Sequence, residues 1–300
     1  MIFNEVKIED AKWAVPLLES NGYRSCEFAF VNLYIWKKVY HTEIARFEDY
    51  IVVRYDYGDE YVHYQFPCGT GDLKAVLEAV LQDAKTLGKI PVISTIPKER
   101  LPDMEELFPG YFRYDNPPGQ SDYVYLQSDL ANLPGRKYQK KRNHCSKFER
   151  TYPDWQFREI GDDSIHCVCE FNDRWANLYD NRDDEGIMTE RRAIEQACRH
   201  YSEMNVKGGY IRVDGEVVAF SFGSKLGSDM FVTHVEKALY DVSGAYAMIN
   251  REMARFLGEG YRYINRENDL DEEGLREAKL SYHPHFRVDK YDATPIDWQG

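Results

Sequence analysis

The chain of 300 residues is long enough for about two domains of ordinary size. Hydrophobic residues make up 43% and charged residues 30%, which fits a globular protein and argues against extensive disorder. The 51 acidic residues outnumber the 38 Lys and Arg and give a net charge of −13, so the chain as a whole is a poor binder of polyanions. Any contact with nucleic acid or phosphate therefore needs a local basic segment.

The sequence argues against secretion, membrane insertion and metal binding. Charged residues interrupt the N-terminal segment where a signal peptide would be apolar, and the longest apolar run, 28–36, is about half of a membrane span. The six cysteines form no Cys-x-x-Cys pair, and His283-Pro284-His285 lacks further ligands. We therefore expect a cytoplasmic protein with free thiols, no metal site and no stable membrane insertion.

Hydrophobic periodicity and turn residues predict a mixed order of helices and strands in the first half. The expected elements are an extended start at 3–8, helices at 11–19 and 28–40, strands at 43–47, 50–57 and 60–66, a helix at 72–88, a strand at 91–95, a helix at 98–107 and a paired region at 111–126. Asp72 caps the helix at 72–88, and Gly88 ends it.

The second half repeats this order. The expected elements are a basic helix at 136–150, helices at 162–178 and 189–203, strands at 208–213, 216–225 and 229–237, a helix at 243–257, a strand at 261–265, a helix at 271–280 and a terminal strand at 285–291. Corresponding elements of the two halves are about 170 residues apart, which favours two copies of one α/β unit. Structure-breaking residues at 116–119 and 133–135 predict domains at 1–130 and 131–300.

Three segments of the second half carry a family resemblance. They are Gly135-Arg136-Lys137-Tyr138-Gln139-Lys140-Lys141-Arg142-Asn143, then His234-Val235-Glu236-Lys237-Ala238 with Ser243-Gly244-Ala245-Tyr246, and Asn265-Arg266-Glu267-Asn268-Asp269 with Leu275-Arg276 and Ala278-Lys279-Leu280-Ser281-Tyr282-His283-Pro284. They resemble the C-terminal domain of phosphatidylglycerol lysyltransferases and its soluble relatives. The element order resembles the GCN5-related N-acyltransferase (GNAT) fold, arranged in tandem as in aminoacyl-tRNA-dependent transferases.

The resemblance implies an α/β (α+β) fold with two tandem GNAT-like units, each a mixed, mostly antiparallel sheet flanked by helices. It also implies that the second unit is the catalytic one and that the first is a degenerate copy that completes the cleft. The hydrophobic membrane-spanning portion of the full lysyltransferases has no counterpart in this sequence, which argues against a lipid acceptor.

The segment 136–150 concentrates positive charge in an acidic chain, with seven Lys and Arg against one acid. Six of its residues are candidates for binding the phosphates of a carrier: Arg136, Lys137, Lys140, Lys141, Arg142 and Asn143. A solvated helix face packed through Tyr138, Cys145 and Phe148 is the alternative.

His234 and Glu236 share one face of the predicted strand at 229–237 if its side chains alternate regularly. Acyl transfer to an amine needs a base, and an imidazole or a carboxylate at a strand end can supply it. Glu236 is favoured because it continues the family motif, and the resemblance adds Tyr282 as an acid for the leaving group. The alternative is a pair that tethers the neighbouring strand.

The turn before the helix at 243–257 predicts a second phosphate contact, at Gly244 and Ala245, because the N-terminus of a helix binds anions. The loop of ordinary acetyltransferases reads Arg/Gln-x-x-Gly-x-Gly/Ala. Here Asp241 takes the basic position, which counts against ordinary use of acetyl-CoA. A plain helix cap at Asp241 or Ser243 is the alternative.

Polar residues follow the predicted strand at 261–265, at the edge of the sheet where ligands collect in α/β proteins. Asn265, Glu267 and Asp269 alternate there and are candidates for binding a substrate amine, with Lys279 for a carboxylate or phosphate. The alternative is a capped turn before the next helix.

Together, the residues predict an acyl- or aminoacyltransferase. Its donor would be a phosphate-bearing carrier, an aminoacyl-tRNA or an acyl-CoA, with no tightly bound cofactor, and its acceptor a small molecule or peptide with an amine or hydroxyl. The alternatives are a catalytically silent GNAT-like module that binds a peptide, nucleotide or metabolite, and an RNA-associated protein that uses the basic helix alone.

Overall fold

The computed structural model describes residues 1–179 and 185–299 and divides into two compact units. The first comprises residues 1–122, 268–276 and 287–300, and the second 123–267 and 277–286. The predicted boundary near residue 130 differs from this division because segments from the end of the chain return to the first unit. No helix in the described ranges is long and apolar enough to cross a membrane.

The first unit is built on one sheet with the strand order β1-β2-β3-β4-β6-β15-β7 and with β5 paired to β3. Its strands are β1 (Asn4–Glu5), β2 (Glu43–Phe47), β3 (Tyr50–Tyr55), β4 (Tyr61–Gln65), β5 (Cys68–Gly69), β6 (Ile90–Pro97), β7 (Phe112–Asp115) and β15 (Lys290–Pro295). All neighbours for which the register is given are antiparallel except β4 and β6, which are parallel.

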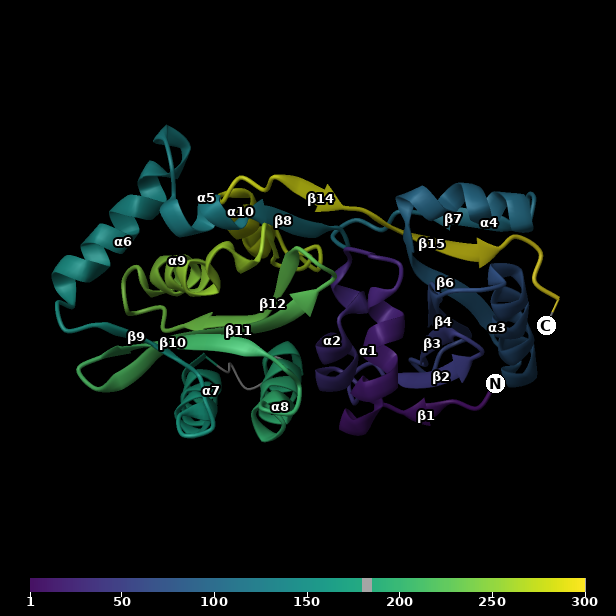
Figure 1. Cartoon of the computed structure of the whole chain (residues 1–300), viewed down its shortest axis with the longest axis horizontal. Helices are drawn as coiled ribbons and strands as arrows, with labels where there is room; N and C mark the ends of the chain where they lie inside the picture. Colours follow the sequence, from purple (N-terminus) through teal and green to yellow (C-terminus); the bar gives the residue numbers. More distant parts are fainter. Residues whose placement is uncertain (180–184, 300) are drawn as a thin grey trace. The chain divides into compact units, whose positions relative to one another are not determined.

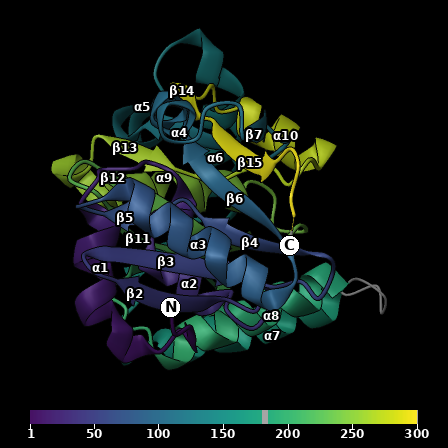
Figure 2. The same ribbon diagram turned by 90° about the vertical axis from the view of Figure 1, so that its right-hand side faces the viewer.

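Helices cover both faces of this sheet. They are α1 (Ala11–Glu19), α2 (Phe30–Ile35), α3 (Leu73–Leu87) and α4 (Leu101–Leu107). α3 lies across β3, β4 and β6 (Figure 2) and buries Val76, Leu77, Val80 and Ala84 completely. Asp72 accepts a hydrogen bond from the Ala75 backbone, and Gly88 ends the helix in the left-handed conformation, so both predicted ends are confirmed.

The second unit holds most of a second sheet, with the order β14-β8-β13-β12-β11-β10-β9. Its strands are β8 (Asp122–Leu126), β9 (Gln156–Glu159), β10 (Lys207–Val213), β11 (Glu216–Leu226), β12 (Met230–Ala238), β13 (Tyr263–Asn265) and β14 (Phe286–Val288). β12 and β13 are parallel, while β9, β10, β11 and β12 form an antiparallel meander.

Two layers of helices enclose this sheet. α6 (Gln139–Thr151) and α9 (Ala245–Leu257) lie over one face, and α7 (Ile165–Tyr179) and α8 (Glu185–Arg199) over the other (Figure 1). α5 (Gln127–Asn132) and α10 (Glu273–Leu280) complete the set. α9 contributes apolar, fully buried side chains to the core of this unit, including Met248, Ile249 and Ala254.

Candidate functional site

The candidate site of the second unit lies where β12 and β13 stop pairing. The two strands pair at Met230 with Tyr263, Phe231 with Ile264 and Val232 with Asn265, while β12 continues to Ala238. Residues of β12 beyond Val232 and the segment after Asn265 therefore interact through side chains instead of the backbone ladder.

Glu236 is the carboxylate at the centre of this region. Its Oε1 accepts a hydrogen bond from Arg266 Nη2 at 2.7 Å, and its Oε2 accepts one from Asn250 Nδ2 at 3.1 Å. The side chains of Glu236 and Arg266 are 12% and 14% exposed. β12, α9 and the end of β13 thus hold the carboxylate in one orientation, as a catalytic or binding carboxylate requires.

Two cations lie over the ring of Tyr282 beside this carboxylate. Lys141 Nζ is 3.7 Å from the ring centroid and Arg266 Cζ is 4.9 Å from it. Burial and repulsion by Arg266 lower the pKa of Lys141 to about 8, although Glu236 partly opposes this. Burial raises the pKa of Tyr282, so its hydroxyl keeps its proton at neutral pH.

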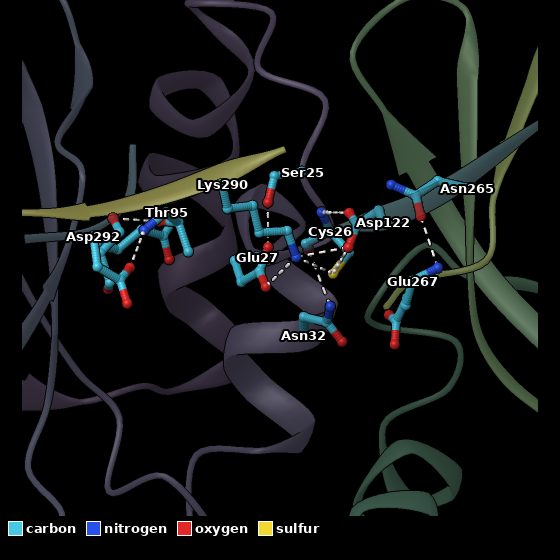
Figure 3. A network of polar contacts seen from close by, with 12 residues as sticks. Ser25, Cys26, Glu27, Asn32, Thr95, Asp122, Asn265, Glu267, Lys290 and Asp292 are labelled. Carbon is cyan, nitrogen blue, oxygen red and sulfur yellow. Dashed lines mark hydrogen bonds and ion pairs between the residues drawn. The ribbon is translucent and has the colours of Figure 1, made fainter. Parts of the chain in front are cut away.

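His234 belongs to a separate hydrogen-bonded relay. Its Nε2 lies 2.8 Å from Ser224 Oγ on β11, and its Nδ1 lies 3.0 Å from Glu267 Oε1 after β13. Glu267 has a left-handed backbone with φ of 58°, and its N–H donates to Asn265 Oδ1 at 2.7 Å. Figure 3 shows the Asn265 side chain directed at the main-chain nitrogen of Glu267, whose carboxylate points away from Asn265. The relay links three neighbouring strands through their side chains.

A β-bulge separates His234 from Glu236. Phe222 pairs with Val235 and Gly223 with Thr233, so His234 is the extra residue on β12. The predicted shared face of His234 and Glu236 assumed regular alternation, and the bulge interrupts that alternation. A Cβ on Gly223 would lie 1.9 Å from the Val232 carbonyl oxygen, so the bulge also requires this glycine.

The predicted amine-binding strip is divided between the two units. Asn265 and Glu267 belong to the second unit, whereas Asp269 belongs to the first. Asp269 is fully buried and accepts hydrogen bonds from Arg276 Nε at 3.0 Å and the Asp271 N–H at 2.9 Å. Asp269 therefore has the contacts of the predicted capped turn.

Lys279 is buried in the second unit, where its Nζ donates to the Arg266 carbonyl oxygen at 2.6 Å. Its own carbonyl oxygen accepts a hydrogen bond from Tyr125 Oη at 2.8 Å. These contacts join Lys279 to the main chain of Arg266 and to Tyr125, so Lys279 has a structural role at the site.

The basic helix presents its charges in two ways. Arg136, Lys137, Lys140 and Asn143 are exposed, as a phosphate-binding surface requires. Arg142 instead donates to the carbonyl oxygens of Leu133 and Gly135, and Lys141 points inward to Tyr282. The exposed members form a basic surface on residues 136–143, which comprise the turn before α6 and its first residues.

Gly244 and Ala245 begin α9 against the middle of α6. Gly244 has a φ of 91°, and a Cβ there would lie 2.7 Å from the His144 carbonyl oxygen. Ala245 is 1% exposed. Close packing of the two helices therefore accounts for the glycine, and the contact of these two residues with a carrier phosphate stays a prediction.

The sequence did not single out Arg266, Asn250 or Ser224. Arg266 lies within the motif Asn265-Arg266-Glu267-Asn268-Asp269. A cation inside an acidic segment at the end of a core strand could have indicated its role. Asn250 and Ser224 sit in a helix and a strand of ordinary pattern, and only the fold brings them to Glu236 and His234.

The first unit has its own buried charged cluster, formed by Cys26, Glu27, Asp122 and Lys290 (Figure 3). Ligand atoms of Cys26, Glu27 and Asp122 lie within 4.8 Å of one another, a spacing that suits a metal ion. Lys290 Nζ lies 2.6 Å from Asp122 Oδ1 and 2.5 Å from Glu27 Oε1. Its ammonium therefore provides the positive charge that these carboxylates need.

Comparison with known proteins shows both the fold and the family of this chain. The fold is that of tandem GNAT proteins: one from the clavulanic acid biosynthesis pathway matches with a TM-score of 0.50 and 10% identity over 99% of both chains. The chain belongs to the family described as "Phosphatidylglycerol lysyltransferase, C-terminal", whose model matches residues 21–294. The predicted fold class and family are both confirmed.

Three individual proteins are similar to this chain. A conserved protein of unknown function from Bacteroides thetaiotaomicron is 37% identical, with a TM-score of 0.93 over 98% of this chain and 100% of that one. L-PGS from Bacillus licheniformis is 15% identical, with a TM-score of 0.68 over 97% and 93% of the two chains. An uncharacterised protein from Mycoplasmoides gallisepticum is 23% identical over 57% of this chain. That match spans about half of the relative's length, at 55%.

Proposed function

We infer that this protein transfers an acyl or aminoacyl group from a phosphate-bearing carrier, an aminoacyl-tRNA or an acyl-CoA, to an amine or hydroxyl acceptor. Its membership of the lysyltransferase C-terminal family supports a transferase of the aminoacyl type. The exposed cations of residues 136–143 supply a surface for the carrier's phosphates in an otherwise acidic chain. The second unit is the catalytic one in this proposal.

The observation that carries the proposal is the largely buried Glu236, held by Arg266 and Asn250 beyond the last residue of β12 that pairs with β13. A fixed carboxylate attracts an ammonium and accepts a proton from it. Asn250 Oδ1 has no hydrogen-bond partner among the described residues, so it is available to an N–H of the acceptor. Glu236 and Asn250 thus form an amine-binding pair.

The reaction forms a bond from the acceptor nitrogen or oxygen to the acyl carbon and breaks the carrier's ester or thioester bond. Glu236 takes the proton of the acceptor, with His234 as the second candidate base. Tyr282, which keeps its proton, donates it to the departing oxygen or sulfur. Glu267 and Asn265 orient His234, and Lys279 fixes the main chain at Arg266.

A transfer assay tests this proposal. The whole chain is incubated with charged tRNAs or acyl-CoAs and a panel of amines, and the products are followed by mass spectrometry. Glu236→Gln keeps the size of the side chain but removes the base, so we expect at least a hundredfold loss of rate. Glu259→Gln changes an exposed carboxylate of the same unit and is the matched control. Equal rates for the two variants would contradict the proposal.

The second candidate is a silent module that binds a peptide, nucleotide or metabolite. Asp241 in the usual basic position and the packing of α6 against Gly244 favour it. Such a module is stabilised by its ligand but turns over none of the donors. Ligand-dependent thermal stabilisation without transfer, unchanged in Glu236→Gln, would support this second function.

A further inference from the structure

The cluster around Tyr282 is short of negative charge. Lys141 and Arg266 both lie over the ring, and Glu236 is the carboxylate that acts on Lys141. The other titratable groups facing Lys141 are Tyr282 and Cys145, and burial raises the pKa of both side chains, to about 11 for Cys145. Two cations therefore share one carboxylate in a largely buried place.

One hydrogen-bond donor of the cluster around Tyr282 has no partner among the described residues. Arg266 Nη2 is used by Glu236, but Nη1 is buried and has no hydrogen-bond partner within the described part of the chain. Leaving a buried donor of a charged group unpaired costs free energy, and proteins seldom tolerate it without a reason. Lys141 lies over the same ring as Arg266, close enough for the two positive charges to repel each other. An unused guanidinium N–H next to an ammonium is the usual arrangement for binding an oxyanion.

We propose that Arg266 Nη1 and Lys141 Nζ bind a carboxylate or phosphate group carried by the acceptor. The binding itself stands on the two observations above, whereas its assignment to the acceptor rests on the proposed function. The exposed cations Arg136, Lys137 and Lys140 remain for the carrier. The acceptor is then a small molecule that carries an anionic oxygen group beside the amine or hydroxyl that reacts.

Titration calorimetry of the whole chain with sodium acetate or sodium phosphate, at fixed chloride, tests the binding. The acetate and phosphate arms distinguish a carboxylate site from a phosphate site. We expect saturable binding of at least one of them, weakened at least tenfold in Arg266→Gln and at least threefold in Lys141→Met. Lys225→Met removes an exposed charge of the same unit, on β11, and should change the affinity less than twofold.

The pH dependence gives a second readout. Acetate keeps its charge above pH 6.5, so its affinity should fall as the pH rises through about 8, where Lys141 loses its proton. Lys141→Met should flatten that dependence. Should Arg266→Gln fail to fold, the partly exposed Lys141→Met still decides the question.

Three results would overturn the inference: no saturable binding, equal affinity in all variants, or an affinity lost only in Lys225→Met. Transfer without anion binding would contradict this inference but leave the proposed function intact. Anion binding without transfer would contradict the proposed function but support the anion site.

Discussion

Each unit has a lysine withdrawn from solvent beside at least one carboxylate, and the two lysines behave in opposite ways. Lys290 of the first unit is 1% exposed and pairs with Asp122 and Glu27, and these charges raise its pKa well above the usual value. Lys141 of the second unit shares one carboxylate with Arg266, and its pKa falls to about 8. The positive charge of the lysine is thus neutralised by two carboxylates in the first unit and only partly paired in the second.

The difference separates a structural cluster from a site that can take a ligand. In the first unit, the Cys26 N–H donates to Asp122 at 2.8 Å and Ser25 Oγ donates to Glu27, so the carboxylates are held from several sides. In the second unit, Arg266 Nη1 and Asn250 Oδ1 lack partners among the described residues. Unsatisfied groups at one site and satisfied groups at the other favour catalysis in the second unit.

Removing the neutralising lysine should have the largest effect. Lys290→Met leaves Asp122 and Glu27 buried without their cation, and we expect a loss of about 3–5 kcal/mol in the free energy of unfolding. Urea denaturation measures it. Lys38→Met, at an exposed position of the same unit, is the control, and Lys290→Met with Asp122→Asn should recover part of the loss. A loss below about 1 kcal/mol would show that the cluster is not held by its charges.

The bulge of the second unit should be nearly as sensitive. Gly223→Ala places a Cβ 1.9 Å from the Val232 carbonyl oxygen, which forces β11 and β12 apart beside His234. We expect a loss of about 1–3 kcal/mol in urea denaturation, together with slower transfer. Gly260→Ala, where a Cβ meets nothing within 4 Å, should leave both unchanged. Wild-type stability in Gly223→Ala would mean that the bulge does not depend on the glycine.

A smaller effect is expected at Asp292 of the first unit. Asp292 Oδ1 accepts a hydrogen bond from the Thr95 N–H at 3.3 Å. Burial, with Glu27 and Asp115 nearby, raises the pKa of Asp292 to about 6. The folded state therefore holds the proton more tightly, and stability falls as the pH rises from about 4 to about 6. Asp292→Asn should gain about 1–2 kcal/mol at pH 7 and nothing at pH 3.5. Equal gains at both pH values would refute this explanation.

The smallest effect is a gain in the second unit. Lys141 is charged at a cost below pH 8, so Lys141→Met should stabilise the fold at pH 7 by about 1 kcal/mol, a figure reduced for solvent screening. The gain should disappear by about pH 10.5, where the lysine is neutral in the unfolded chain as well. Guanidinium denaturation at both pH values measures it. A loss of stability at pH 7 would mean that favourable contacts already pair the charge of Lys141, which is then not available to a ligand.

Local patterns predicted most of the elements. The strand at 43–47 matches β2, and the helix at 11–19 matches α1, because alternation, helical spacing and turn residues are properties of short segments. The predicted helix at 28–40 is α2, which ends at Ile35, because an apolar run without periodicity does not show where a helix stops. The terminal strand at 285–291 is two strands, β14 and β15, in different sheets, since long-range pairing leaves no local signal.

The candidate site was predictable in its residue types but not in its pairing. Glu236 stood out as an acid at a strand end, and Lys141 as one of several cations. Which cation of α6 turns inward depends on how α6 packs against α9, and this packing fixes Lys141 over Tyr282. Asn250 reaches Glu236 from a helix and Arg266 reaches it from the end of a different strand, so only tertiary structure joins them.

β15 comes from the last residues of the chain, yet it lies between β6 and β7 in the first sheet and brings Lys290 with it. During synthesis, β6 and β7 therefore lack the strand between them until residues 290–295 have also been made. Until then, Asp122 and Glu27 lack their counter-ion, and β6 and β7 each have an open edge. An isolated N-terminal fragment should consequently need a chaperone or aggregate, and supplying the C-terminal peptide in trans should rescue it.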